Sequence, residues 1–382
     1  MNSSEEKKLD LKEIRDEIDV IDKELVDLFE KRMKLCRDVA EFKFTTGKSV
    51  LDKEREQSKL NTLTSYAKDD FSRHGIEELF TQIMSMSRKY QYRLLASKGL
   101  KDSLEFTFVD RLWKDDVKVV YQGIPGAYSH EALRSYFGEY VDEYNVPTWR
   151  KAMEDLRDGV ADYAVLPIEN SQAGAVGDVY DLLMEFDNYI VKYVDIKINH
   201  ALLGVKGSSI DDIKVVYSHP QAIMQCREYL EKHNWQEVAQ SNTAISAKKV
   251  SEYNDITKAA VASVKTAEIY GLDVLEEHIN TSDVNTTRFI ILSRSKICKK
   301  DANNILISFE VAHESGSLYE ALSHIIYNDV NMTKIESRPI PNKKWQYRFF
   351  IEIEGRVSDP GVVNALRGLN AETLNMKILG NY

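Results

Sequence analysis

The chain has 382 residues, of which 43% are hydrophobic and 29% are charged. This length predicts two or three domains, and the composition is typical of folded rather than disordered proteins. The net charge of −10, from 51 Lys and Arg against 61 Asp and Glu, argues against a general nucleic-acid-binding role, which needs a basic surface.

No apolar run approaches the roughly 18 residues of a membrane span, and the polar N-terminus lacks the features of a signal peptide. A cytoplasmic protein with no membrane partner is therefore expected. The cysteines Cys36, Cys226 and Cys298 lie far apart and follow no metal-ligand spacing. They are predicted to be reduced thiols in the core, and no metal site is expected.

The first 96 residues are predicted to form an all-α domain. They contain no proline and two glycines, a distribution that favours long helices. Apolar residues from Ile14 to Phe42 recur at spacings of four and three, which is typical of a helix in a bundle, and Arg32 interrupts them. Gly47 is predicted to end this helix, and further helices are expected from residue 51 and over 76–95.

Arg32 needs a partner, because an unpaired buried charge is destabilising by several kcal/mol. Considered alone, it is as compatible with an internal salt bridge as with an anionic ligand. Other polar side chains share faces of the three helices and predict a common pocket: Arg15, Lys43, Asp52, Arg55, Glu56, Ser87 and Gln91. Arg15 and Arg32 are about 26 Å apart along one helix. Arg15 is therefore expected to reach the pocket of a second, antiparallel copy.

This constellation resembles that of the all-helical chorismate mutases. The resemblance implies that Arg15, Arg32 and Arg55 bind the substrate carboxylates, and that Lys43 and Gln91 bind the ether oxygen that breaks. It assigns the remaining hydroxyl and carboxylate contacts to three further residues: Asp52, Glu56 and Ser87.

From residue 117 the sequence changes to short apolar runs that alternate with helical stretches, which predicts an α/β domain over residues 117–296 after a linker at 97–116. Polar residues follow several of the predicted strands, and such positions converge on a crevice in open α/β sheets. The segments concerned are 123–130, 167–171, 218–222, 242–244 and 285–289.

These segments, in this order, resemble the prephenate dehydratases, whose fold has two lobes like those of periplasmic binding proteins. The resemblance implies that Thr287, in the triplet Thr-Arg-Phe, is catalytic. Arg288 is expected to anchor a substrate carboxylate, and Glu169 or His219 is the candidate proton source. The residues expected to line the cleft are Glu169, Asn170, Ser171 and Gln221. The sequence Gly-Ile-Pro-Gly of the first loop also occurs in relatives that prefer arogenate. The choice between prephenate and arogenate as the substrate therefore stays open.

Residues 302–382 are predicted to form, in order, a strand, a helix, two strands, a helix and a strand. This order is compatible with an α+β ferredoxin-like fold. Two segments resemble the phenylalanine-binding segments of the regulatory ACT domain. One opens the first helix, and the other ends the second strand. Their residues are Gly316, Ser317, Leu318, Glu336, Ser337, Arg338 and Pro339.

As a whole the chain resembles the bifunctional chorismate mutase/prephenate dehydratases. This implies conversion of chorismate to prephenate and of prephenate to phenylpyruvate, feedback inhibition by phenylalanine, no cofactor, and a homodimer or a dimer of dimers. Two alternatives remain open at this point. One is a non-catalytic, amino-acid-responsive binding protein, and the other is a dehydratase whose helical domain only dimerises.

Overall fold

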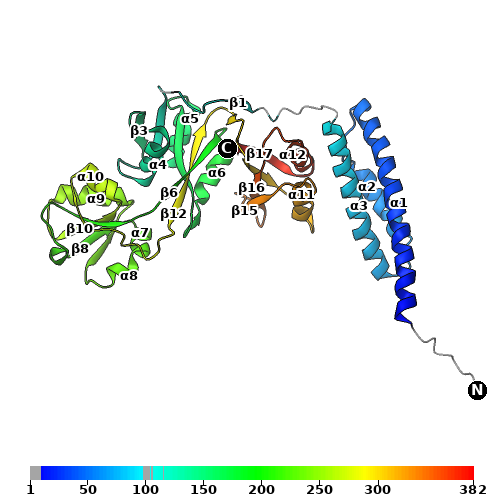
Figure 1. Cartoon of the computed structure of the whole chain (residues 1–382), viewed down its shortest axis with the longest axis horizontal. Helices are drawn as coiled ribbons and strands as arrows, with labels where there is room; N and C mark the ends of the chain where they lie inside the picture. The colour runs from blue at the N-terminus through cyan, green and yellow to red at the C-terminus, as the bar shows by residue number, and fades with distance from the viewer. Residues whose placement is uncertain (1–9, 98–103, 105, 115) are drawn as a thin grey trace, which may run out of the picture. The chain divides into compact units, whose positions relative to one another are not determined.

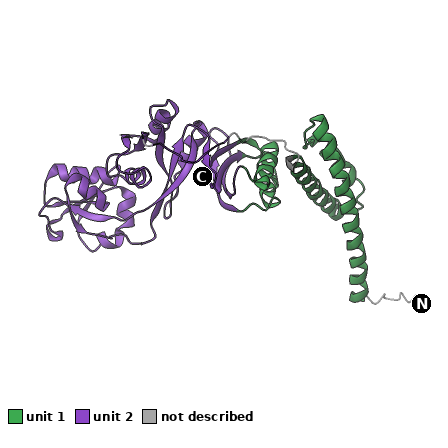
Figure 2. Cartoon of the chain, turned by 45° about the horizontal axis from the view of Figure 1, so that its top comes forward, with its two compact units in different colours: residues 1–104, 310–331, 358–376 green, residues 105–309, 332–357, 377–382 purple. Residues whose placement is uncertain are grey.

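The computed structural model describes residues 10–97, 104, 106–114 and 116–382. The chain divides into two compact units, coloured in Figure 2. The first unit comprises residues 1–104, 310–331 and 358–376, and the second comprises 105–309, 332–357 and 377–382. In the described part of the chain, no helix is both long enough and apolar enough to cross a membrane.

Three long helices form the N-terminal part of the first unit: α1 (Leu11–Thr46), α2 (Lys53–Thr64) and α3 (Asp70–Ser97) (Figure 1). The predicted stop is confirmed, since Gly47 ends α1 in the left-handed conformation with φ 68°. Asp52 begins α2, where its side chain accepts a hydrogen bond from the amide of Arg55. The third helix starts six residues earlier than the predicted residue 76.

Two helices from the C-terminal third complete the first unit, namely α11 (Ser317–Ile326) and α12 (Pro360–Glu372). α12 packs against both α11 and α3. The predicted apolar stripe of α1 faces outward in the single chain. Leu25 is 53% exposed, Leu28 60% and Leu35 65%, while Ala40 is the buried residue of this helix.

The second unit is built on a large mixed sheet in the order β15-β16-β14-β17-β6-β12-β4-β2-β3, with β5 paired to β4. The helices α4, α5 and α6 connect its N-terminal strands. The bounds are β2 (Lys118–Gln122), α4 (Tyr128–Phe137), β3 (Asp142–Val146), α5 (Trp149–Arg157), β4 (Tyr163–Asn170), β5 (Gly174–Ala175), α6 (Gly177–Glu185), β6 (Tyr189–Lys197), β12 (Thr286–Ser293), β14 (Asn304–Glu310), β15 (Met332–Pro339), β16 (Tyr347–Glu354) and β17 (Leu374–Asn381).

A second sheet, in the order β11-β7-β10-β8-β9, forms another lobe of the same unit. The chain crosses between the sheets at 198–200 and at 277–285. Asn280 ties the crossings together, because its side chain accepts from the His200 amide (2.6 Å) and donates to the Ile198 carbonyl (3.0 Å). The bounds are β7 (Ala201–Gly204), η1 (Ile210–Asp212), β8 (Val215–Ser218), α7 (Pro220–Gln225), α8 (Arg227–Leu230), β9 (Gln236–Ala239), α9 (Thr243–Tyr253), β10 (Lys258–Ala262), α10 (Val264–Tyr270) and β11 (Asp273–Glu276).

Two details differ from the sequence-based expectations. The segments around 107 and 297 were expected to be connectors, but β1 (Thr107–Val109) pairs in parallel with β13 (Ile297–Lys299), because three-residue strands carry too little alternation to be recognised. Cys226 and Cys298 are buried as predicted, but the prediction is wrong for Cys36, which is half-buried.

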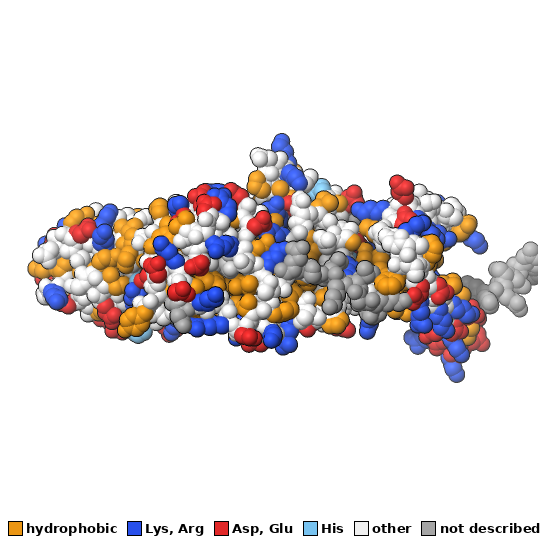
Figure 3. Space-filling view, turned by 90° about the horizontal axis from the view of Figure 1, so that it is seen from above, with side chains coloured by type: hydrophobic (Ala, Val, Ile, Leu, Met, Phe, Trp, Pro, Cys, Tyr) orange, Lys and Arg blue, Asp and Glu red, His pale blue; other side chains and the backbone are white. Residues whose placement is uncertain are grey.

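Surface charge is mixed in sign. On the face shown in Figure 3, Lys and Arg side chains are interspersed with Asp and Glu side chains. An anionic ligand therefore depends on cations that the fold gathers locally.

Candidate functional site

The three N-terminal helices enclose a groove of about 930 Å³. Its lining includes the polar residues that the sequence analysis selected, with the exception of Arg15: Arg32, Lys43, Asp52, Arg55, Glu56, Ser87 and Gln91. Residues from α1, the loop before α2, α2 and α3 thus face one space.

Arg32 contributes a cation to this groove. Its Nη1 donates to the Ser87 hydroxyl and lies 3.5 Å from the Ile83 carbonyl and 3.9 Å from Cys36 Sγ. Among the described residues, no carboxylate lies within ion-pair distance of Arg32. Since both protein oxygens are uncharged, this environment favours an anionic ligand over the internal salt bridge considered above.

Lys43 and Gln91 lie deeper in the groove. Lys43 Nζ donates to the Val50 carbonyl at 2.7 Å, and burial lowers the pKa of this ammonium, with Asp52 and Glu56 acting in the opposite direction. Gln91 is 6% exposed, and its side-chain oxygen has no hydrogen-bond partner within the described part of the chain. Both groups are therefore placed to bind a polar ligand.

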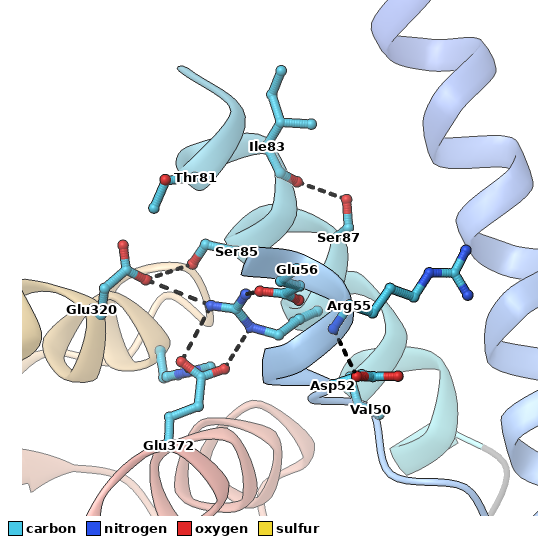
Figure 4. Close-up of polar contacts among 12 residues, drawn as sticks. Val50, Asp52, Arg55, Glu56, Thr81, Ile83, Ser85, Ser87, Glu320 and Glu372 are labelled. Atoms are coloured by element: carbon cyan, nitrogen blue, oxygen red, sulfur yellow. Dashed lines mark hydrogen bonds and ion pairs between the residues drawn. The ribbon is translucent and has the colours of Figure 1, made fainter. Parts of the chain in front are cut away.

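The residues of α2 point in different directions. Asp52 accepts from the Arg55 amide at 3.1 Å, and Figure 4 shows the Arg55 side chain extending away from Glu320 and Glu372. Glu56 instead accepts a hydrogen bond from Arg88 of α3 at 2.5 Å. Sequence analysis missed Arg88, because its other partners come from residues more than 200 positions away.

Arg15 lies outside the groove. It is exposed on α1, and because α1 is one continuous helix, the separation of about 26 Å from Arg32 is maintained. In a single copy of the chain the two guanidinium groups therefore do not meet.

A second pocket, a cleft of about 370 Å³, lies in the second unit. Each of the five predicted segments contributes to its lining. The polar and aromatic residues around it include Gln122, Tyr128, Trp149, Asn170, His200, His219, Gln221, Gln225, Asn242 and Thr287.

The glycine loop at 123–127 does not offer all its amides to a ligand. The Gly126 amide donates to His130 Nδ1 at 3.0 Å, and the Ala127 amide donates to the Ile124 carbonyl at 3.0 Å. These two amides are thus engaged within the loop and the helix after it.

Thr287 and Asn170 form the polar centre of the cleft. They are paired across β12 and β4, and Asn170 Nδ2 donates to Thr287 Oγ1 at 2.9 Å and to Asn285 Oδ1 at 2.9 Å. Because the threonine oxygen accepts from Asn170, its own hydrogen is left for a ligand.

Three other candidates do not reach the cleft. Glu169 Oε2 forms an ion pair with Lys334 Nζ at 2.7 Å, and the Ser171 hydroxyl donates to the Val284 carbonyl at 3.0 Å. Arg288 binds both oxygens of Asp195 at 2.8 and 3.0 Å, which raises the pKa of its guanidinium. The pleat explains these placements, since Glu169 and Arg288 point to the opposite face from Asn170 and Thr287.

Sequence analysis also missed a chain of polar residues in the cleft. Tyr128 Oη lies 3.1 Å from His200 Nδ1, and His200 Nε2 lies 3.1 Å from Gln225 Oε1. Burial lowers the pKa of His200 to about 4, so its ring is neutral at pH 7. Its position three residues after the end of β6 (Tyr189–Lys197) is the signal that could have found it.

His219 is the other titratable group in the cleft. Its Nδ1 accepts from the Gln221 amide at 3.2 Å, and burial lowers its pKa. In the neutral ring the proton is therefore on Nε2, where it can be donated to a ligand.

The candidate effector residues lie in two different units. In the first unit, Gly316 precedes α11 with φ 84° and Ser317 begins the helix. In the second unit, Arg338 at the end of β15 binds Asp181 at 2.6 Å and lies so close to Gly177 that a Cβ there would clash with its guanidinium.

Family models match the two stretches of the chain that contain these pockets. The family model "Chorismate mutase type II" matches residues 14–92, and "Prephenate dehydratase" matches residues 119–297. A bifunctional chorismate mutase/prephenate dehydratase of Buchnera aphidicola subsp. Schizaphis graminum is 33% identical, with 98% of this chain and 97% of that protein covered. The chain belongs to the bifunctional chorismate mutase/prephenate dehydratase family. This confirms the prediction of an enzyme with both activities.

Solved structures match about 70% of the chain. A prephenate dehydratase from Arthrobacter aurescens, in complex with L-Phe, is 30% identical with a TM-score of 0.65, and the match covers 70% of this chain and 90% of that one. GqqA, described as a quorum quenching acylase, is 31% identical with a TM-score of 0.62, over 69% of this chain and 96% of that one. Because one fold supports different activities, the roles of individual residues must be argued from the cleft itself.

Proposed function

We propose that the groove of α1, α2 and α3 is the chorismate mutase site. Arg32 and Arg55 bind the substrate carboxylates, and Lys43 and Gln91 donate to the ether oxygen. Asp52, Glu56 and Ser87 complete the contacts to the hydroxyl and carboxylate groups. The observation that carries this assignment is the position of Arg32, a half-buried cation that faces the groove with no carboxylate within ion-pair distance among the described residues.

The reaction fits a site without a nucleophile. A Claisen rearrangement is unimolecular, so the protein holds the extended enol-pyruvyl ether in a chair and stabilises the charge that develops on its oxygen. An acceleration of about 10⁶ corresponds to about 8 kcal/mol. Charge-assisted hydrogen bonds of about 1.5–3 kcal/mol each contribute a large part of this.

The mutase site is completed by a second copy of the chain. The outward apolar stripe of α1 supports this proposal, since side chains such as Leu28 and Leu35 are 60% and 65% exposed in the single chain, and burying them is favourable. An antiparallel second copy brings its Arg15 to the groove, and the twofold symmetry produces two composite sites.

The cleft of the second unit is the proposed dehydratase site. The ring C–CO₂⁻ bond of prephenate breaks, its electron pair enters the ring that becomes aromatic, and the hydroxyl group leaves as water after gaining a proton. Thr287 donates a hydrogen bond to the departing hydroxyl oxygen, and Asn170 orients Thr287. A threonine hydroxyl is too weak an acid to supply the proton itself. Of the two candidate proton sources, His219 lines the cleft and would supply the proton from its imidazolium form, which becomes the neutral ring, whereas Glu169 is paired with Lys334.

The C-terminal elements form the proposed ACT domain, which binds phenylalanine as a feedback inhibitor. The strand order β17-β14-β16-β15, with α11 after β14 and α12 after β16, supports a ferredoxin-like fold. The relative from Arthrobacter aurescens is described in complex with L-Phe, which supports the choice of effector. The effector acts by binding one arrangement of the domains more tightly than another.

The test is incubation of the purified full-length chain with chorismate, with chorismate, prephenate and phenylpyruvate measured over time. Chorismate is expected to disappear and phenylpyruvate to form. A chain that leaves chorismate intact but converts added prephenate would indicate a helical domain that only dimerises. A chain that converts neither compound would indicate a binding protein.

A further inference from the structure

Arg88 of α3 occupies a buried position between the mutase groove and two C-terminal helices. Its side chain is 9% exposed and borders the groove. Its Nη1 lies 2.5 Å from Glu56 Oε2, its Nε 2.7 Å from Glu372 Oε1, and its Nη2 3.7 Å from Glu320 Oε2. Figure 4 shows Glu56, Glu320 and Glu372 pointing toward one centre from α2, α11 and α12.

The C-terminal carboxylates are themselves fixed. Glu320 Oε2 accepts from the Ser85 hydroxyl at 2.9 Å, and Glu372 Oε2 lies 3.0 Å from His324 Nε2. Burial alone raises the pKa of Glu372, but His324 and Arg88 lower it to about 2, so this carboxylate is ionised at pH 7. A planar guanidinium with each nitrogen directed at a fixed carboxylate has little freedom to turn.

Glu56 depends on this arrangement. It is the side chain of the groove that Arg88 touches, and the hydrogen bond uses Oε2, which leaves Oε1 to accept from a ligand hydroxyl. A carboxylate held on one oxygen by a fixed cation keeps its direction.

We propose that Arg88 is a positioning residue of the mutase site, which fixes the direction of the Glu56 side chain while Glu320 and Glu372 fix Arg88. The inference rests on the proposed role of Glu56 in binding the substrate. It makes the rearrangement in the N-terminal helices dependent on residues from the C-terminal third of the chain.

The main experiment measures mutase kcat/KM of full-length Arg88→Met at pH 7.5. A decrease on the order of 10- to 100-fold is expected, which is the range for a lost charge-assisted hydrogen bond. Arg88→Lys, which keeps a positively charged donor toward Glu56, should recover part of this loss. Dehydratase activity of the same preparation serves as the control for folding of the second unit.

A triple variant separates positioning from folding. Arg88→Met with Glu320→Gln and Glu372→Gln removes the unpaired carboxylates, so the first unit should regain its stability while Glu56 still lacks its donor. The proposal predicts that the mutase defect persists. Recovery of wild-type mutase activity in this variant would overturn it, because Arg88 would then serve the fold alone.

Two further variants test the carboxylates on either side of Arg88, namely Glu372 and Glu56. Glu372→Ala should lower mutase kcat/KM several-fold, while Glu314→Ala, which alters an exposed carboxylate just before α11, should not. Glu56→Gln with wild-type mutase activity would contradict the proposed function of Glu56. A defective Glu56→Gln together with wild-type mutase activity in Arg88→Met would overturn only the role of Arg88.

Discussion

Replacing Thr287 by valine removes the hydroxyl group proposed to act in the dehydratase step and preserves the shape of the side chain. The structure limits the effect on folding. Asn170 Nδ2 loses Thr287 Oγ1 but retains Asn285 Oδ1 at 2.9 Å and the Thr286 carbonyl at 3.3 Å. The free energy of unfolding should therefore fall by about 1 kcal/mol or less.

The effect on catalysis should be much larger. Removing one oriented donor from a site of developing charge costs about 10²- to 10³-fold in kcat, or about 3–4 kcal/mol. Dehydratase kcat of Thr287→Val should decrease by this factor, measured as phenylpyruvate formed from prephenate. Because the mutase groove lies in the other unit, chorismate should still be consumed and prephenate should accumulate.

Thr286→Val is the matched control. Thr286 precedes Thr287 on β12 but does not line the cleft, so the same substitution there should leave dehydratase kcat within about twofold of the wild-type value. A Thr287→Val enzyme with more than half of the wild-type kcat, or equal losses in both variants, would refute the proposed role of the hydroxyl.

Three other outcomes are expected. Arg32→Ala should abolish mutase activity and leave dehydratase activity intact, and loss of both would indicate a folding role. Arg338→Ala should weaken inhibition of the dehydratase by phenylalanine, and an unchanged inhibition curve would place the effector site elsewhere. The pKa of Glu372 is lowered from 4.5 to about 2, so its stabilising contribution is complete above pH 4.5 and is lost as the pH falls through 2. The unfolding free energies of wild type and Glu372→Gln can be measured by urea titration with circular dichroism. Their difference should shrink by up to about 3 kcal/mol between pH 5 and pH 2. A difference that does not change with pH would contradict this.

The parts of the fold that follow local patterns were predictable from the sequence. Alternating spacings of four and three define α1, and Gly47 ends it where only a residue that tolerates positive φ fits without strain. In the second unit, β4 and β12 appear as apolar runs with polar ends. Because β12 runs antiparallel to β4, the start of β12 with Thr287 lies beside the end of β4 with Asn170, and this neighbourhood is not covered by the rule for the carboxyl ends of parallel strands.

Contacts between distant segments were not predictable in the same way. Arg288 binds Asp195 because both side chains lie on the same face of the sheet. The residues directly after Arg288 on β12 are apolar, so they show no alternation from which the face of Arg288 could be predicted. In the sequence, Arg88 looks like an ordinary residue on a helix surface. Its carboxylate partners, Glu320 and Glu372, come from the far end of the chain. Arg15 shows the opposite case, since helix length alone excludes it from the groove of its own copy.

The most direct test of the composite mutase site is the activity of a heterodimer that combines Arg15→Ala in one copy with Arg32→Ala in the other, isolated with two different affinity tags. Each homodimeric variant should lack mutase activity, because both of its sites lose one guanidinium group. In the heterodimer one site loses both groups and the other keeps both, so about half of the wild-type mutase activity should return. A heterodimer as inactive as either parent would show that Arg15 and Arg32 do not act together across two copies.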